Sequence, residues 1–352
     1  MQEQKRLLQD QAARHAGFAT QDAVKLLYQA EFGGGHLLTD RRSALKFLRR
    51  EASEAPKRAP EELFEPIGGG FCRLQIGALR GENELLAAWR LFCEGASRAY
   101  GSKAGLLARF APLRCLAAEG GLPFGPDELG AFLSAYEAQG CPMLSHSDGY
   151  RLANAPAYRV LPEALAALFP LCVAVERRLL AGKRTVLAID GLCGSGKSTV
   201  AGTLARLYGA SLVRMDDFFL PPELRTRERL DAPGGNIHHE RFLAEVAPGL
   251  LNGEAFEYRP FDCSDFSFGR PVAVPKADLT IVEGSYSQHP DLRRLYDLTA
   301  FLYCAPETQL ARIAARDGAE WLRRFISEWI PLENAYFSAF SVKEQSDFRI
   351  ET

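Results

Sequence analysis

Residues 191–199 read Gly191-Leu192-Cys193-Gly194-Ser195-Gly196-Lys197-Ser198-Thr199, a run of the form GxxxxGK[ST]. An apolar, strand-like stretch precedes it at residues 185–190, and a helical pattern continues from it to residue 208. Glycines let consecutive backbone N–H groups turn toward phosphate oxygens, where larger side chains would obstruct the turn. Lys197 adds a positive charge, Ser198 offers a hydroxyl to Mg²⁺, and the start of the helix adds its dipole. The run therefore predicts a phosphate-binding loop for a nucleoside triphosphate.

The bulk composition indicates a globular protein with more than one domain. At 352 residues the chain is longer than one typical domain core. With 42 basic and 44 acidic residues, it has no basic excess of the kind that favours binding to nucleic acid or to a membrane surface. We therefore expect neither partner. No apolar run is long enough to span a bilayer, and residues 1–15 lack the apolar segment of a secretory signal. Eight cysteines without CxxC spacing predict reduced thiols in the cytoplasm.

The first part of the chain, residues 1–160, is predicted to be a mainly helical domain. Apolar residues recur there at helical spacing over residues 21–30, 42–52, 83–100 and 126–137. Glycine- and proline-containing breaks separate these segments. Residues 161–183 read as two short helices that stop at Gly182, and we take them as a connector between domains.

Residues 184–352 alternate between strands and helices. Strands are expected at 185–190, 211–215, 279–282 and 299–303, and helices at 197–208, 240–251, 307–316 and 319–329. This alternation predicts an α/β fold, the doubly wound parallel sheet of a P-loop NTPase. Ligands of such sheets bind at the carboxyl ends of the strands. We therefore expect the remaining functional groups at the same edge as the glycine-rich loop.

Acidic residues stand at the ends of two of these strands. The run Met215-Asp216-Asp217-Phe218-Phe219 follows one strand, and Glu283-Gly284 follows another in the manner of a Walker B segment. Asp216 can accept the proton of an attacking hydroxyl, and Glu283 can lie near Mg²⁺ and its water shell. The alternatives are that the aspartate caps a turn and that the glutamate is solvated surface.

Two arginines on a predicted helix complete this set. Arg312 and Arg316 are four residues apart and share one face of the helix. Guanidinium groups aimed at a transferring phosphoryl group can each contribute a factor of about 10³–10⁵ in rate. The alternative is a solvated face that pairs with Glu307 or Asp317.

These ordered motifs give the second domain a family resemblance. From about residue 185 to residue 352 the chain resembles the uridine kinase-like P-loop kinases, relatives of phosphoribulokinase and pantothenate kinase. The resemblance implies an ATP- and Mg²⁺-dependent phosphotransferase whose acceptor is a small hydroxyl compound, most readily the 5′-hydroxyl of a nucleoside. It implies that Asp216 is the catalytic base, that Glu283-Gly284 is the Glu-Gly of the family, and that Arg312 and Arg316 are lid arginines. It leaves self-association into a homo-oligomer open.

The resemblance also implies an acceptor pocket. Asp231 corresponds to the acid that holds the ribose hydroxyls, and Phe261-Asp262 corresponds to the aromatic–aspartate pair of the nucleoside pocket. Phe218 or Phe261 could offer the flat face that a nucleobase needs. The chain departs from the well-known uridine kinases after Asp262 and over residues 231–242. Two alternatives therefore stay open: a kinase of a non-nucleoside alcohol or sugar phosphate, and a nucleotide-sensing regulatory protein.

The N-terminal half resembles a segment that precedes similar kinases, and this resemblance implies no activity. Its polar clusters lie at residues 31–36, 65–73 and 146–151. They either converge on an anion or substrate pocket or stabilise a helical domain as loops and caps. Elsewhere, His238 and His239 are adjacent and make a poor metal pair. Cys193 is either an oxidisable thiol of lowered pKa or only a small side chain.

Overall fold

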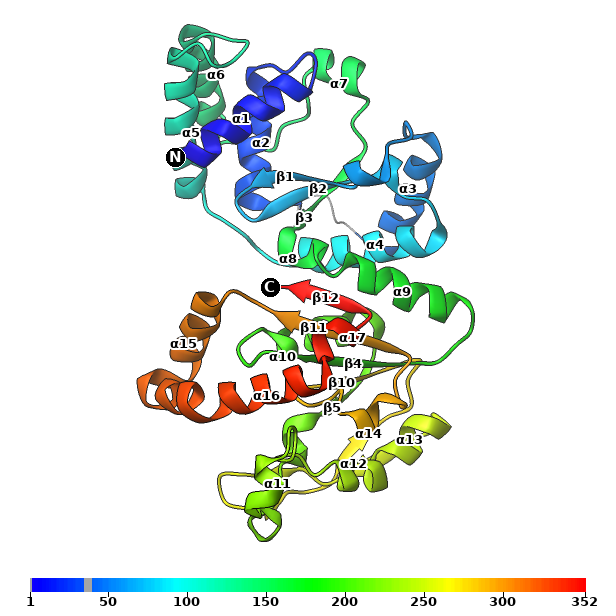
Figure 1. Cartoon of the computed structure of the whole chain (residues 1–352). Coiled ribbons are helices and arrows are strands. Elements are labelled where there is room, and N and C mark those ends of the chain that lie inside the picture. Colours follow the sequence, from blue (N-terminus) through cyan, green and yellow to red (C-terminus); the bar gives the residue numbers. More distant parts are fainter. Residues whose placement is uncertain (1, 35–39) are drawn as a thin grey trace. The chain divides into compact units, whose positions relative to one another are not determined.

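The computed structural model describes residues 2–34 and 40–352 (Figure 1). The chain forms two compact units, Met1–Phe169 and Pro170–Thr352. The division between them falls inside the segment 161–183, which the sequence suggested as a connector. No helix in the described part of the chain combines the length and the apolar character needed to cross a bilayer.

Helices make up most of the first unit. They are α1 (Gln2–Arg14), α2 (Thr20–Phe32), α3 (Arg41–Glu54), α4 (Glu82–Ala96), α5 (Lys103–Ala118), α6 (Pro126–Ala138), α7 (Asp148–Asn154) and α8 (Glu163–Ala166). Side chains that cap free N–H groups explain several starting points. Asp40 accepts from Ser43 N at 2.6 Å before α3, and Ser102 accepts from Gly105 N at 3.0 Å before α5.

The first unit also contains a three-stranded antiparallel sheet, which the expectation of a mainly helical domain did not include. Its strands are β1 (Phe64–Gly68), β2 (Phe71–Gln75) and β3 (Tyr158–Pro162), in the order β1-β2-β3. The strands are short and contain Pro66, Gly68 and Pro162, which normally count against a strand. Every residue of β2 is buried, so this strand lacks the alternation that marks a half-buried one.

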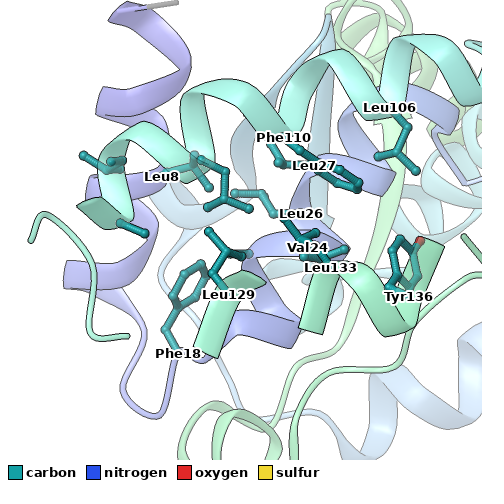
Figure 2. Packing of buried hydrophobic residues seen from close by; sticks show 14 of the residues in the cluster. Leu8, Phe18, Val24, Leu26, Leu27, Leu106, Phe110, Leu129, Leu133 and Tyr136 are labelled. Carbon is teal, nitrogen blue, oxygen red and sulfur yellow. The ribbon is translucent and has the colours of Figure 1, made fainter. Parts of the chain in front are cut away.

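The apolar core of the first unit lies among α1, α2, α5 and α6. Figure 2 shows Leu8, Leu27, Phe110 and Leu133, one from each of these helices, directed toward a common interior. Each of these side chains is no more than 2% exposed. At roughly 1.5–3 kcal/mol for each fully buried large apolar side chain, this cluster is the main source of stability for the four helices.

The second unit is built on a five-stranded parallel sheet, with strand order β12-β11-β4-β10-β5. The strands are β4 (Thr185–Gly191), β5 (Ser211–Arg214), β10 (Leu279–Glu283), β11 (Leu298–Tyr303) and β12 (Phe348–Glu351). The predicted parallel sheet with helices packed on it is therefore confirmed. The C-terminal edge strand β12 was not predicted, because four residues between turns give little periodic signal.

Helices and two small strand pairs surround this sheet. The helices are α9 (Phe169–Leu180), α10 (Lys197–Tyr208), α11 (Arg227–Asp231), α12 (His239–Glu245), α13 (Ala247–Asn252), α14 (Pro290–Arg293), α15 (Pro306–Arg324), α16 (Ile330–Phe340) and α17 (Val342–Gln345). The antiparallel pairs are β6 (Phe256–Tyr258) with β9 (Val272–Val274), and β7 (Phe261–Asp262) with β8 (Ser267–Phe268). The helix predicted over 240–251 is divided into α12 and α13, because Pro248 stands in the first turn of a new helix that begins at Ala247.

The helical segment after β11 is interrupted in two places. Gly318 has φ 86° and ψ 172°, so α15 bends there, after Arg312 and Arg316. A π-helical segment, Phe325–Trp329, then joins α15 to α16. Such segments occur often at functional sites.

The order of strands brings three chain segments to one edge of the sheet. In β10, Glu283 pairs in register with Ile189 of β4 and with Arg214 of β5. Because all three strands are parallel, the segments that follow them start side by side. These segments are the glycine-rich loop, residues 215–219 and residues 284–289. Figure 1 shows α10, α15 and α16 near these strands.

Candidate active site

The glycine-rich loop adopts the backbone that its glycines permit. Gly191 has φ 138°, and a Cβ there would overlap the carbonyl oxygen of Leu302. Gly196 has φ 85°, and the space where a Cβ would lie is open. The helix α10 starts at the next residue, and the N–H groups of a first helical turn have no acceptor within the helix. This combination of free donors and open space fits phosphate oxygens.

A cavity of about 540 Å³ lies over this loop. It brings together eight residues that the sequence singled out: Gly194, Gly196, Lys197, Ser198, Thr199, Asp216, Glu283 and Arg316. It is also lined by Cys193 and Gly284, which stand in the same two motifs, and by residues without a predicted site role: Phe219, Asn236, Ser285, Tyr286, Phe325, Trp329 and Glu333. A phosphate loop, several carboxylates and an aromatic wall thus share one cavity.

Ser198 and Glu283 meet at one side of the cavity. The hydroxyl of Ser198 donates to Oε2 of Glu283 at 3.2 Å. Burial raises the pKa of Glu283 above its usual value, and the nearby charge of Asp216 adds to this. Mg²⁺ prefers hard oxygen ligands and commonly takes one or two from protein while phosphates and waters supply the rest. The residues present therefore fit Mg²⁺ bound with a nucleotide.

Lys197 is held by partners within the protein. Its ammonium donates to Gly191 O at 2.8 Å, to Leu192 O at 3.0 Å and to Oγ of Ser285 at 3.1 Å. An ammonium has three protons to donate, so a phosphate must replace at least one of these acceptors.

A carboxylate of α16 stabilises the same region. Oε2 of Glu333 accepts from Cys193 N at 2.8 Å, and Oε1 accepts from Oγ of Ser285 at 2.6 Å. Sequence reasoning missed Glu333 because it lies 140 residues after Cys193 in a helix with no polar motif. It could have found Ser285, which follows Glu283-Gly284 directly.

The two neighbouring aspartates after β5 have different surroundings. Asp216 is exposed and lines the cavity. Oδ2 of Asp217 accepts from the hydroxyl of Tyr258 at 2.7 Å, and burial raises the pKa of Asp217. Asp216 is therefore the aspartate that can reach a bound acceptor.

The residues predicted for the acceptor pocket lie outside the cavity. Phe218 is fully buried and its ring packs against Phe242 and Tyr258. Phe261 is buried in β7. The one-position shift between Phe218 and Phe219 decides which ring faces the ligand, because the turn Met215–Phe218 directs the first ring into the core.

The two acids predicted for that pocket also point elsewhere. Asp262 accepts from Ser264 N at 2.8 Å. The side chain of Asp231 is 72% exposed at the end of α11 and lies 3.6 Å from Arg227. Neither is among the residues that line the cavity.

Of the other predicted loop and lid residues, one lines the cavity and three do not. Gly191 packs on Leu302, and Ser195 is fully buried with no hydrogen-bond partner for its hydroxyl. Arg312 donates to Oγ1 of Thr352 at 3.0 Å and does not line the cavity. Arg316 lines the cavity and is paired with Asp317 at 2.8 Å, the alternative partner considered from the sequence.

Asp190 links three segments of the site by hydrogen bonds. This fully buried carboxyl group at the end of β4 accepts from the N–H groups of Gly191, Tyr286 and Gln288 at 2.7–3.2 Å, and from the hydroxyl of Tyr336 at 3.0 Å. Burial raises its pKa to about 6. It ties the phosphate loop to the segment after Glu283 and to α16.

Two secondary expectations can be compared with the structure. Burial raises the pKa of Cys193 to about 12, which does not fit an activated thiol. His239 lies with His289 and Asp291 in a group whose ligand atoms are within 4.8 Å of one another. The two imidazole rings are stacked at 12°, and Nδ1 of His239 already accepts from Arg229. Stacked rings cannot both direct in-plane lone pairs at one ion.

The polar clusters of the first unit form a buried network. Glu65 accepts from His15 at 2.6 Å and from Gln11 at 2.7 Å. His146 donates to Asp22 at 2.7 Å, and Arg73 donates to Gln29 at 2.9 Å. Within the described residues these side chains are one another's partners, which supports a stabilising role. Gly35 and His36 of the first cluster lie outside the described residues.

Comparison with known proteins adds relatives for part of the chain. No protein-family model matches the sequence. Uridine kinases from Clostridium perfringens are 27% identical over 141 residues, which cover 37% of this chain and 67% of theirs. Among solved structures, a possible uridine kinase from Bacillus stearothermophilus has 21% identity and a TM-score of 0.40 over 53% of this chain and 97% of its own. Shikimate kinase from Bacteroides thetaiotaomicron has 16% identity and a TM-score of 0.24 over 47% and 85%.

Because both TM-scores lie below 0.5, the family assignment depends on the sequence relatives and on the phosphate loop. The second unit is similar in sequence to these uridine kinases, and the protein is a P-loop kinase.

Proposed function

We propose that the protein transfers the γ-phosphoryl group of ATP, with Mg²⁺, to the hydroxyl of a small metabolite, and that this metabolite is a nucleoside phosphorylated at its 5′-hydroxyl. The observation that carries the proposal is that Asp216 opens into the same cavity as the phosphate loop and the Ser198–Glu283 pair. The uridine kinase relatives support a nucleoside acceptor. So do the aromatic side chains Phe219, Tyr286 and Trp329, which offer flat faces to a base.

In the proposed reaction the loop amides and Lys197 bind the phosphates, and Ser198 with Glu283 would hold Mg²⁺, which supplies positive charge to the phosphate oxygens. Asp216 takes the proton of the acceptor hydroxyl while the oxygen of that hydroxyl bonds to the γ-phosphorus. The bond from that phosphorus to the bridging oxygen breaks, and ADP leaves. Arg316 would stabilise the transferring group after exchanging Asp317 for phosphate.

The acceptor contacts differ from those that the resemblance implied. We assign the base-binding face to Phe219 in place of Phe218, because only the former lines the cavity. Asp231 and the Phe261-Asp262 pair are not among the lining residues, although the strand that carries Phe261 packs against the turn Met215–Phe218. Arg312, which contacts the loop carbonyl of Gly194 at 3.4 Å, is proposed to brace the loop.

The proposal extends to the organisation of the chain. Residues 184–352 would form the kinase domain with a doubly wound sheet, residues 1–160 a separate domain, and residues 161–183 their connector. Limited proteolysis tests this: a stable fragment should begin within the connector. Cleavage first inside either domain would count against it.

The decisive test is the variant Asp216→Asn. Loss of the general base should lower kcat about 10²–10⁴-fold, while calorimetry should show ATP–Mg²⁺ binding nearly unchanged. Asp217→Asn is a matched control, because its side chain can still accept from Tyr258 and does not line the cavity. Full activity of the Asp216 variant would exclude the proposed base. ATP binding without turnover on any acceptor would favour a nucleotide-sensing regulator instead.

A further inference from the structure

The cavity is lined by more acidic than basic side chains. Its acids are Asp216, Glu283 and Glu333, and its bases are Lys197 and Arg316. Both bases already have partners: Lys197 bonds to the loop and to Ser285, and Arg316 bonds to Asp317. In the proposed reaction both bases serve the phosphates of ATP. With Mg²⁺ held at Glu283, the carboxylates left without a cation beside an acceptor are Asp216 and Glu333.

Glu333 contributes most to this asymmetry. Its carboxylate oxygens accept from two neutral donors, the backbone N–H of Cys193 and the hydroxyl of Ser285. The residue is only 6% exposed, so water and salt screen its charge poorly. Lys197 is separated from it by the Ser285 hydroxyl, and a bound triphosphate would neutralise that lysine.

Glu333 lines the cavity together with two aromatic residues that are close to it along the chain or through Ser285. Trp329, one turn earlier along the α15–α16 helical segment, and Tyr286, next to Ser285, also line the cavity. These are the aromatic residues assigned above to the acceptor. Each carboxylate oxygen has a second lone pair, so Glu333 can accept a hydrogen bond from a hydroxyl or an N–H of the acceptor. A phosphate or carboxylate at that place would be repelled.

We infer that Glu333 makes the kinase select an uncharged hydroxyl acceptor and reject acceptors that carry a phosphate or a carboxylate. This rests on the proposed function and narrows its acceptor class. It speaks against the sugar phosphate alternative, because an anionic acceptor would lie beside a buried carboxylate.

Matched acceptors test the inference. Uridine and orotidine share the ribose and its 5′-hydroxyl and differ by a carboxylate on the ring; panthenol and pantothenate differ similarly as plain alcohols. In the wild-type protein, kcat/KM should favour the neutral member of an accepted pair by at least 10-fold, and calorimetry with an ATP analogue should show the same preference in binding. Equal use of both members, or preference for the anion, would overturn the inference.

The variant Glu333→Gln assigns the preference to this residue. It should raise the ratio of anionic to neutral kcat/KM by at least 10-fold, which corresponds to about 1.4 kcal/mol. Glu328→Gln is the matched control, because Glu328 is on the same helical segment, pairs with Arg324 and does not line the cavity. A purely structural role for Glu333 would change the KM for ATP and the kcat for both acceptors alike, leaving the ratio unchanged, and would refute the inference.

Two outcomes separate the inference from the proposed function. If neither member of any pair is phosphorylated, the nucleoside or alcohol kinase proposal fails, and the calorimetric preference for uridine over orotidine alone decides the inference. If Glu333→Gln does not fold, the wild-type preference in binding and turnover still decides whether anions are excluded.

Discussion

Acidification should lower the stability of the first unit, because His146 becomes protonated. The ring of His146 is 7% exposed. Its Nδ1 donates to Asp22, and its Nε2 lies 2.6 Å from the hydroxyl of Tyr158, which can donate only while that nitrogen is unprotonated. Burial lowers the pKa of His146 to about 4, and the charges of Arg73 and Lys25 add to this against the opposing effect of Asp22.

The expected magnitude follows from this pKa. A histidine whose pKa is lower in the folded state than in the unfolded state contributes its full stability above about pH 6.5, and loses it as pH falls toward 4. At 1.36 kcal/mol per pKa unit, the loss is about 2 kcal/mol at pH 5 and about 3 kcal/mol at pH 4. Burial by itself would raise the pKa of Glu65, but its hydrogen bonds and the charge of Arg73 outweigh burial and lower this pKa to about 2. The stability that Glu65 contributes is therefore lost only below about pH 4.5. The two contributions therefore fall in different pH windows.

Hydrogen exchange measured by mass spectrometry, corrected for intrinsic rates, can read this loss segment by segment. Protection of α2 and of residues 146–158 should fall between pH 6.5 and 4 in the wild type. The variant His146→Asn should lack most of this dependence, since its amide does not titrate. His289→Asn is the matched control, because burial also lowers the pKa of His289 to about 4 but this residue belongs to the second unit. This variant should leave the pH dependence of protection in the first unit unchanged. A first unit whose protection stays constant from pH 6.5 to 4 would refute the reasoning.

Two further outcomes are expected. Gly191→Ala should destabilise the second unit by about 3 kcal/mol or more, because φ 138° is unfavourable for alanine and the new methyl group meets Leu302; urea unfolding of this variant measures the loss, and an unchanged midpoint would contradict it. Thiol labelling at pH 8 should modify the exposed Cys115 and Cys263 well before Cys193, whose burial raises its pKa to about 12. Peptide mapping reads the order, and early labelling of Cys193 would disagree.

Sequence and structure agree most closely where the signal is local. The loop at residues 191–199 has glycines at positive φ, and α10 begins at Lys197 as its pattern predicts. The errors arise where distant contacts decide. The helix α5 contains Pro112 and has apolar residues on its exposed face too, such as Leu107 and Ala111, so no clear apolar stripe marks it. The strands β1 and β2 pair with each other although Pro66 and Gly68 disfavour a strand. Contacts with distant elements stabilise them: β2 also pairs with β3, and β1 packs against α2.

The candidate site divides in the same way. Lys197, Ser198 and Glu283 could be named from the sequence because short motifs fix the chemistry of a phosphate loop and a strand-end carboxylate. Which aromatic ring faces the ligand could not be named, since a short turn rotates Phe218 into the core and leaves Phe219 at the cavity.

The amino-acid sequence alone determined that this chain has a phosphate loop on a parallel sheet, because both depend on residues close together in the chain. Only the tertiary structure brought Glu333 to Cys193 and Ser285, and Tyr336 to Asp190. These contacts join α16 to strand ends about 50 to 150 residues away. No local pattern encodes them, because they form only when packing of the apolar core brings these elements together.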